Sequence, residues 1–249
     1  MLDEISGSSH DPYMYGAQLR LESVWNKHWS SSVGVAALGI VNEDRLNAAQ
    51  SSTLSGVGTT NTPVTAWHVP NQNGGNLRSA VGGLSGSVGS LQNNYTPIVA
   101  DASVTFTLDE FWHYNVPFPI RLGADFIHNP AASTENNGYS VGVLFGKAGK
   151  KGLWELGYTY KRIEGDAWFE EVLDSNFGAF YQAGSTRSGN QTGYWSGTNM
   201  KGHVLRTSYS PYNALTLGVI ATFTELIQES PAGSDSKTTR VFLDASLKF

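Results

Sequence analysis

Hydrophobic and polar residues alternate with a period of two in nine separate segments of the chain. In residues 98–109, apolar side chains occupy every even position from Ile98 to Leu108, and polar ones occupy the odd positions from Asp101 onward. A period of two places alternate side chains on opposite faces of a β-strand. No segment has a 3.6-residue period, so we predict an all-β chain. The other eight predicted strands are 13–25, 29–41, 118–126, 139–146, 153–162, 203–209, 215–226 and 240–249.

The connections between these strands alternate in length. Those at 26–28, 148–152 and 210–214 are tight, and 109–117 is intermediate. The long, polar ones are roughly 42–96, 129–138, 166–201 and 228–237. Short turns at one end and long loops at the other are typical of outer-membrane barrels, whereas structureless loops of this length are unusual in compact soluble domains.

These patterns predict an antiparallel, up-and-down transmembrane β-barrel with about nine visible strands. Residues 1–12 form a polar N-terminal segment, and residues 13–249 form the barrel. The longest extracellular loops are expected near 42–96 and 166–201. Aromatic residues near the strand ends, including Trp25, Trp112 and Tyr212, would form the two interfacial girdles, although a soluble core with aromatic caps has the same composition.

Composition narrows the function classes further. The chain has no cysteine, so disulfides and cysteine-ligated metals are excluded. Its formal net charge is −5 and only 15% of its residues are charged, which argues against a nucleic-acid surface. No stretch approaches the eighteen apolar residues that a transmembrane helix needs. The six histidines are scattered without metal-ligand spacing, so we expect no metal, no cofactor and no enzymatic activity.

The number of strands raises a parity problem. If the last strand ends in the periplasm, then counting back through nine alternating strands leaves the N-terminus outside, whereas bacterial single-chain barrels have even strand numbers. A hairpin hidden at 80–91 would add two strands and leave the number odd. We therefore expect the chain to be the C-terminal portion of a larger barrel. The alternative is a complete small barrel whose strand number differs by one.

Three stretches carry a resemblance to a known family: "LWELGYTYKRIEGDAWFEEVLDSNFGAF", "GHVLRTSYSPYNALTLGVIATFTEL" and the closing "DASLKF". Together they resemble the C-terminal half of a family of Gram-negative outer-membrane porins, best over 152–249 and back to about Tyr13. The resemblance implies an outer-membrane barrel that conducts small solutes, preceded in the family by a coiled-coil-like segment and further strands. It also implies that Phe249 is the aromatic end recognised by the barrel-assembly machinery.

A pore needs polar and charged side chains on its lumen face, because they set the field that passing ions experience. Both signs occur, so no strong ion selectivity follows. The same residues could instead form cross-strand salt bridges that stiffen the wall. The alternation assigns the following residues to the lumen: Arg20, Glu22, Asp101, Arg121, Asp125, Glu155, Lys161, Arg206, Arg240, Asp244 and Lys248.

The long connection 166–201 is both acidic and aromatic. If it folds inward, it would narrow the pore with a constriction formed by Asp166, Glu170, Glu171 and Asp174. The alternative is a solvated outer loop, which is the commoner fate of an acidic segment.

The sequence therefore predicts a porin of the bacterial outer membrane, through which small hydrophilic solutes or ions diffuse passively. Its expected partners are outer-membrane lipid, the barrel-assembly machinery and those solutes, with no nucleic acid and with a homo-oligomer left open. Two alternatives remain. One is a structural or anchoring barrel plugged by its loops, and the other is a soluble extracellular β-sandwich that binds a ligand through its loops.

Overall fold

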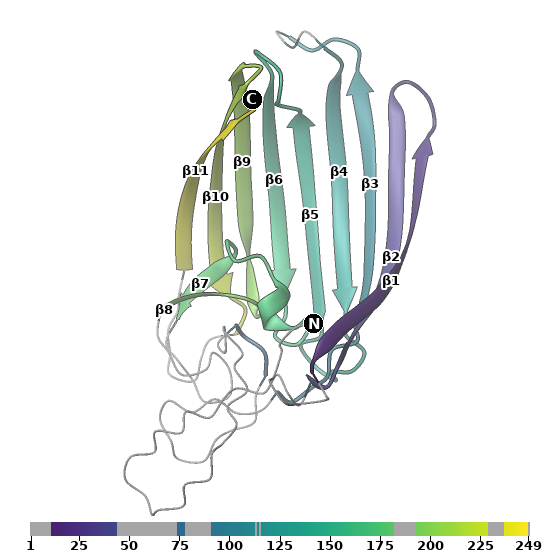
Figure 1. Cartoon of the computed structure of the whole chain (residues 1–249), viewed down its shortest axis with the longest axis vertical. Helices are drawn as coiled ribbons and strands as arrows, with labels where there is room; N and C mark the ends of the chain where they lie inside the picture. The colour runs from purple at the N-terminus through teal and green to yellow at the C-terminus, as the bar shows by residue number, and fades with distance from the viewer. Residues whose placement is uncertain are drawn as a thin grey trace, which may run out of the picture.

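The computed structural model describes residues 11–43, 74–77, 91–112, 114, 116–181, 193–228 and 237–248. Most of these residues form one large, curved sheet (Figure 1). Its nine strands are β1 (Tyr13–Val24), β2 (Trp29–Val41), β3 (Ile98–Leu108), β4 (Phe118–His128), β5 (Asn137–Gly146), β6 (Trp154–Ile163), β9 (Met200–Tyr212), β10 (Leu215–Leu226) and β11 (Lys237–Leu247). A short 3₁₀ helix, η2 (Glu170–Val172), and a two-stranded sheet of β7 (Gly178–Tyr181) and β8 (Gly193–Ser196) complete the described elements.

The large sheet is an antiparallel meander in which chain neighbours are also sheet neighbours. The strand order is β1-β2-β3-β4-β5-β6-β9-β10-β11, and among the strands that the structure describes only β7 and β8 stand outside it. Each of the nine predicted segments corresponds to one of these strands, so the all-β, up-and-down antiparallel fold is confirmed. The prediction missed β7, β8 and η2, which lie inside the connection 166–201. It also made β9 too short, because that strand spans residues 200–212 rather than 203–209.

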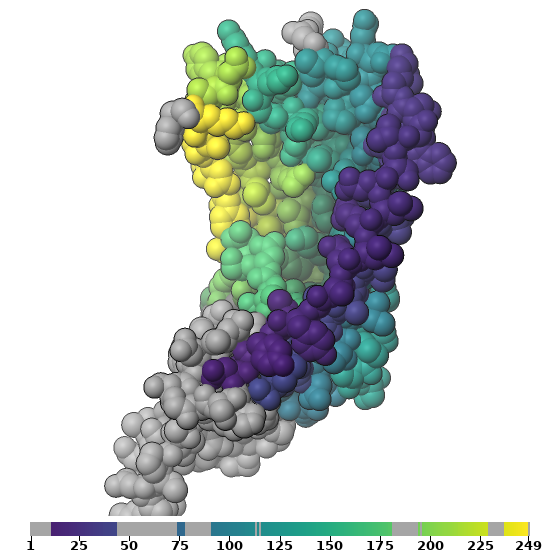
Figure 2. All heavy atoms as spheres, turned by 45° about the vertical axis from the view of Figure 1, so that its right-hand side comes forward, coloured from purple at the N-terminus to yellow at the C-terminus, as the bar shows by residue number. Residues whose placement is uncertain are grey.

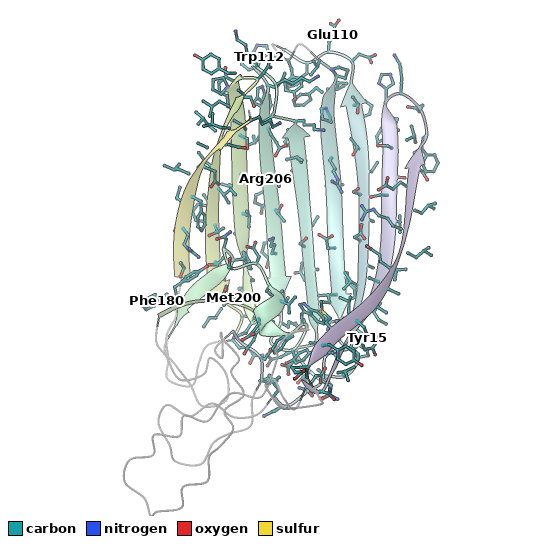
Figure 3. All side chains as sticks on the ribbon, viewed as in Figure 1. Tyr15, Glu110, Trp112, Phe180, Met200 and Arg206 are labelled. Carbon is teal, nitrogen blue, oxygen red and sulfur yellow. The ribbon has the colours of Figure 1, made fainter. Side chains whose placement is uncertain are left out.

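Short and long connections gather at opposite ends of the sheet, as predicted, and we call these the turn end and the loop end. At the turn end, the β1–β2 hairpin is closed by Asn26, whose side-chain oxygen accepts the backbone N–H of His28 at 2.8 Å and of Trp29 at 3.0 Å. Asparagine favours turns because its side chain satisfies backbone donors in this way. Figure 3 places Trp112 at the turn end and Tyr15 at the loop end.

The sheet is open. Strands β1 and β11 are its two edges, and both run from the loop end to the turn end. Figure 2 shows them as the two rims of a hollow whose floor is formed by the middle strands. Direct closure would have to pair β1 with β11 in parallel, whereas every other pair in the sheet is antiparallel. The nine described strands therefore form a strongly curved sheet that is not closed into a barrel.

Burial is concentrated at the two ends of the sheet. At the turn end, Tyr114, Phe118 and Leu153 form one cluster, in which the rings of Phe118 and Tyr114 are 4.9 Å apart. At the loop end, one cluster contains Tyr95 and Phe169, and another contains Phe177 and Met200. Between the ends, one face of the sheet is apolar and exposed: Leu19 is 75% exposed and Leu243 is 79% exposed.

Three predicted features lie outside the described residues. These are the N-terminal residues 1–10, the hairpin at 80–91 except for Leu91, and the terminal Phe249.

Candidate functional site

The strand register places the predicted lumen residues on a single face of the sheet, because directly paired residues of neighbouring strands project to the same side. One row of partners runs from Arg20 through Gly34, Asp101, Asp125 and Ser140 to Lys161. Three further rows of register partners run beside this one. They connect Glu22 with Arg240, Arg121 with Arg206, and Glu155 with Asp244. Lys248 follows β11 two residues after Ser246 and continues the same alternation.

This charged face is the concave one. The connection between β6 and β9, residues 164–199, folds back over the sheet, and we call its described residues (164–181 and 193–199) the inner loop. The backbone N–H of Phe180 donates to the Thr238 hydroxyl at 2.8 Å, and Thr224 donates to the Gly178 carbonyl. Thr224 and Thr238 are register partners on the charged face. Figure 2 shows the inner loop inside the hollow between β1 and β11.

The charges in the hollow are largely balanced by neighbours. Arg20 on β1 reaches across β2 to Asp101 on β3, with Nη1 and Oδ1 3.2 Å apart. Arg206 lies 3.5 Å from Glu155, and the Ser140 hydroxyl donates to Asp125 at 2.6 Å. The predicted lumen residues comprise six cations and five anions, so the hollow has little net charge. Partial exposure lets water screen these pairs, so each stabilises the sheet only modestly.

A polar cleft of about 270 Å³ lies on this face. Two arginines from β4 and β9, two aspartates from β3 and β4, and hydroxyl and glycine residues of β5 and β6 form its walls. The principal lining side chains are Asp101, Arg121, Asp125, Ser140, Thr159 and Arg206. Charges of both signs facing water in one cleft can hold small polar solutes or ions transiently, without a preference for either sign.

The inner loop contacts the charged face at two further points. Asp174 is 3.3 Å from Lys161, whose ammonium group also lies 5.4 Å from the centre of the Phe177 ring. Arg240 donates to the Ser175 carbonyl at 3.3 Å, and its guanidinium stacks 4.0 Å from the centre of the Tyr194 ring. A second cleft of about 250 Å³ remains between this part of the loop and β4, β5 and β6. The inner loop thus occupies part of the hollow near the loop end.

Of the four acidic residues predicted to form a constriction, Asp174 faces Lys161 in the hollow, whereas Asp166 is buried. The Asp166 carboxylate accepts hydrogen bonds from the backbone N–H of Leu77 at 2.9 Å, from Asn93 at 2.6 Å and from the Tyr95 hydroxyl at 3.1 Å. Burial raises the pKa of Asp166 above its ordinary value, and these hydrogen bonds oppose that rise. These contacts tie the inner loop to the connection between β2 and β3.

Glu170 is a second buried anchor, and Glu171 beside it is half-buried. Glu170 accepts a hydrogen bond from the backbone N–H of Asn76 at 2.8 Å, while its own backbone N–H donates to the Asn76 side-chain oxygen at 2.9 Å. The Asn76 amide also donates to the carbonyls of Gly165 and Trp168, at 2.7 and 2.8 Å. This reciprocal contact joins segments more than ninety residues apart and holds the start of the inner loop.

No pattern in the sequence marks Asn76, Asn93, Tyr95 or Asn129 as part of this site. Asn129 is fully buried and donates to the carbonyls of Asn94 and Asp166, both at 2.9 Å. In a long polar connection, asparagine is expected to occupy solvated turns. The hydrogen-bond partners of these four residues lie tens of positions away in the sequence. No local pattern distinguishes such an anchor from a turn residue.

The described residues contain no group of three or more His, Asp or Glu side chains that could hold a metal ion. They also contain no helix long and apolar enough to cross a membrane.

No protein-family model matches the chain, and no curated protein is significantly similar to it.

Proposed function

We propose that this chain forms part of the wall of a porin in the bacterial outer membrane, through which small hydrophilic solutes or ions diffuse passively. One observation carries the proposal: the sheet exposes an aliphatic face on its convex side and a charged face on its concave side. A soluble protein buries its aliphatic face, whereas a membrane barrel turns it to lipid and faces its polar residues inward. Strands of 10 to 13 residues also suit a tilted membrane crossing.

The resemblance to Gram-negative outer-membrane porins supports the same proposal, and it includes the expectation of a larger barrel. Because β1 and β11 run in the same direction, an odd number of additional strands would close the sheet with antiparallel pairs only. A second copy in the same membrane orientation would instead meet each edge with a parallel strand. Additional strands therefore fit the open edges better than a closed dimer does.

The soluble sandwich is the weaker alternative. It requires a second sheet packed against the aliphatic face. Among the described residues the second sheet is the small β7–β8 pair, and it lies on the charged face. A barrel plugged by its loops is the stronger alternative, because the inner loop enters the hollow.

Single-channel recording in a planar bilayer tests the proposal. The chain is refolded into detergent, and its insertion is confirmed independently by flotation with lipid vesicles. Discrete conductance steps with weak discrimination between cations and anions, which the nearly balanced charge of the hollow predicts, would support a conducting wall and would show that this chain closes a pore without additional strands. Inserted but silent protein would leave either the plugged barrel or a wall that closes only with additional strands. Protein that stays in the aqueous fraction contradicts a membrane location.

A further inference from the structure

The convex, aliphatic face carries its charge in one place. Of the Arg, Lys, Asp and Glu residues in the nine described strands, four project to this face: Arg162, Lys201, Glu225 and Lys237. They are consecutive register partners on β6, β9, β10 and β11, so they form a single row. The row lies at the loop end, where the aliphatic face stops. We call it the outer ionic row.

Cations predominate in this row. Lys201 lies 3.1 Å from one Glu225 oxygen, and Lys237 lies 3.7 Å from the other. Arg162 pairs separately with Glu164, just beyond β6, at 3.1 Å. Two lysines therefore share one carboxylate, and these three side chains together carry a net positive charge. The Lys237 side chain is 73% exposed.

From the outer ionic row towards the turn end, the side chains on the convex face change from charged to aromatic and then to aliphatic. The next row towards the turn end contains Tyr160, His203, Phe223 and Thr239, which are paired across the same four strands. The row after that contains Tyr158, Leu205, Ala221 and Val241. The first two rows line a groove of about 420 Å³, whose walls include both lysines, Tyr160, His203 and Phe223.

This succession of cations, aromatic rings and aliphatic side chains matches the layers of a lipid monolayer. Phosphate lies outermost, the interface that aromatic residues prefer lies beneath it, and the hydrocarbon lies deepest. Lysine binds phosphate as a compact point charge, and basic residues at a membrane surface attract anionic lipid. A groove continuous with an aliphatic face can hold a headgroup while the acyl chains extend along that face.

We propose that Lys201 and Lys237 bind the phosphate of an anionic lipid headgroup at the loop end of β9–β11. This site rests on the proposed membrane location, since its acyl chains would lie on the aliphatic face. Glu225 has a positioning role, because it holds both lysine side chains over the groove.

Native mass spectrometry of the detergent-solubilised chain tests the site by titration with three probes: phosphatidylglycerol, phosphatidylcholine and inorganic phosphate. The test variant is Lys201→Gln with Lys237→Gln. The matched control is Lys150→Gln with Lys151→Gln, which removes the same charge from the exposed turn between β5 and β6. We expect tighter binding of phosphatidylglycerol than of phosphatidylcholine. The test variant should weaken it about fivefold for each lysine removed, and the control should leave it unchanged.

Each other outcome overturns a specific part of the proposal. Equal retention of the two lipids, or an unchanged affinity in the test variant, eliminates the headgroup site. If inorganic phosphate displaces phosphatidylglycerol at similar concentrations, the site binds free phosphate and the lipid is eliminated as the source of the phosphate group. Flotation with vesicles separates this inference from the proposed function. A chain that floats but binds lipids without selection contradicts only the headgroup site, whereas a chain that does not float contradicts both.

Discussion

Asp166 is a fully buried carboxylate that belongs to the fold of the loop end. Removing a carboxylate from water is unfavourable unless hydrogen bonds replace the lost hydration. Three donors from Leu77, Asn93 and Tyr95 supply that replacement. Each donor comes from the region before β3, so the contacts hold the inner loop against segments distant in the sequence.

We predict that Asp166→Asn loosens the inner loop by about 1–3 kcal/mol, because the new amide N–H₂ would face the N–H₂ of Asn93. The measurement is the rate of limited proteolysis within the inner loop, compared with that of Asp109→Asn at the exposed turn end. The control should digest like the unmodified chain. Equal rates for all three proteins would show that Asp166 does not anchor the loop.

The pH dependence of the same contact has a definite sign. Because burial raises the pKa of Asp166, the folded chain binds this proton more tightly than the unfolded chain does. The stabilisation from this group is therefore complete below the ordinary Asp pKa of about 3.9 and is lost as the pH rises through the raised value. The difference in digestion rate between the unmodified chain and Asp166→Asn should change across that window. A difference independent of pH contradicts this assignment.

At the scale of the element, the strands of the charged face depend on glycine to bring long side chains together. Gly34 lies between Arg20 and Asp101 in the register. A Cβ at this position would collide with the Asp101 carboxylate, whereas a Cβ at Gly218 would meet its nearest atom at 3.7 Å. The edge strand β1 thus gains a contact with β3 that crosses over β2.

We predict that Gly218→Ala stabilises the chain and that Gly34→Ala does not. Alanine stabilises an unstrained strand position by about 0.4–1 kcal/mol, because the unfolded chain loses freedom. Gly218→Ala should show that gain in urea unfolding. Gly34→Ala should lose it, since displacing Asp101 breaks the partly exposed pair with Arg20, which contributes up to about 1 kcal/mol. Equal midpoints for the two variants would contradict a role for the Arg20–Asp101 pair.

At the scale of the whole molecule, a membrane wall and a soluble sheet differ in whether lipid or water covers the convex, aliphatic face. Leu205 and Arg206 are neighbours on the interior strand β9 and project to opposite faces. Leu205 is 43% exposed, and the Arg206 side chain is 51% exposed, so water would reach both at similar rates. Lipid on the convex face would protect only Leu205.

We predict that a water-soluble maleimide labels Arg206→Cys and not Leu205→Cys in vesicles, and labels both in denaturant. The chain has no natural cysteine, so each label reports one position. Labelling is quantified by mass spectrometry on chains confirmed to float with the vesicles. Equal modification of the two cysteines in folded protein would contradict a lipid-covered convex face and favour a water-soluble sheet.

The sequence alone determined the strands, their order and the composition of their two faces. Alternation with period two reports directly which side chains share a face, since the backbone geometry of a strand is local. Asp101 and Arg206 were assigned to the charged face for this reason, and the register places them there. The sequence also located the long connection 166–201 without indicating β7 or β8, which are only four residues each.

Only the tertiary structure decided where that connection lies and what its acidic residues do. Asp166 and Asp174 are equivalent in a sequence pattern, yet one is buried among Leu77, Asn93 and Tyr95 and the other faces Lys161. Likewise, Arg162, Lys201 and Lys237 are separated along the chain and meet through the register of β6, β9, β10 and β11. Contacts between distant segments depend on how strands pair and curve, and a local pattern does not carry that information.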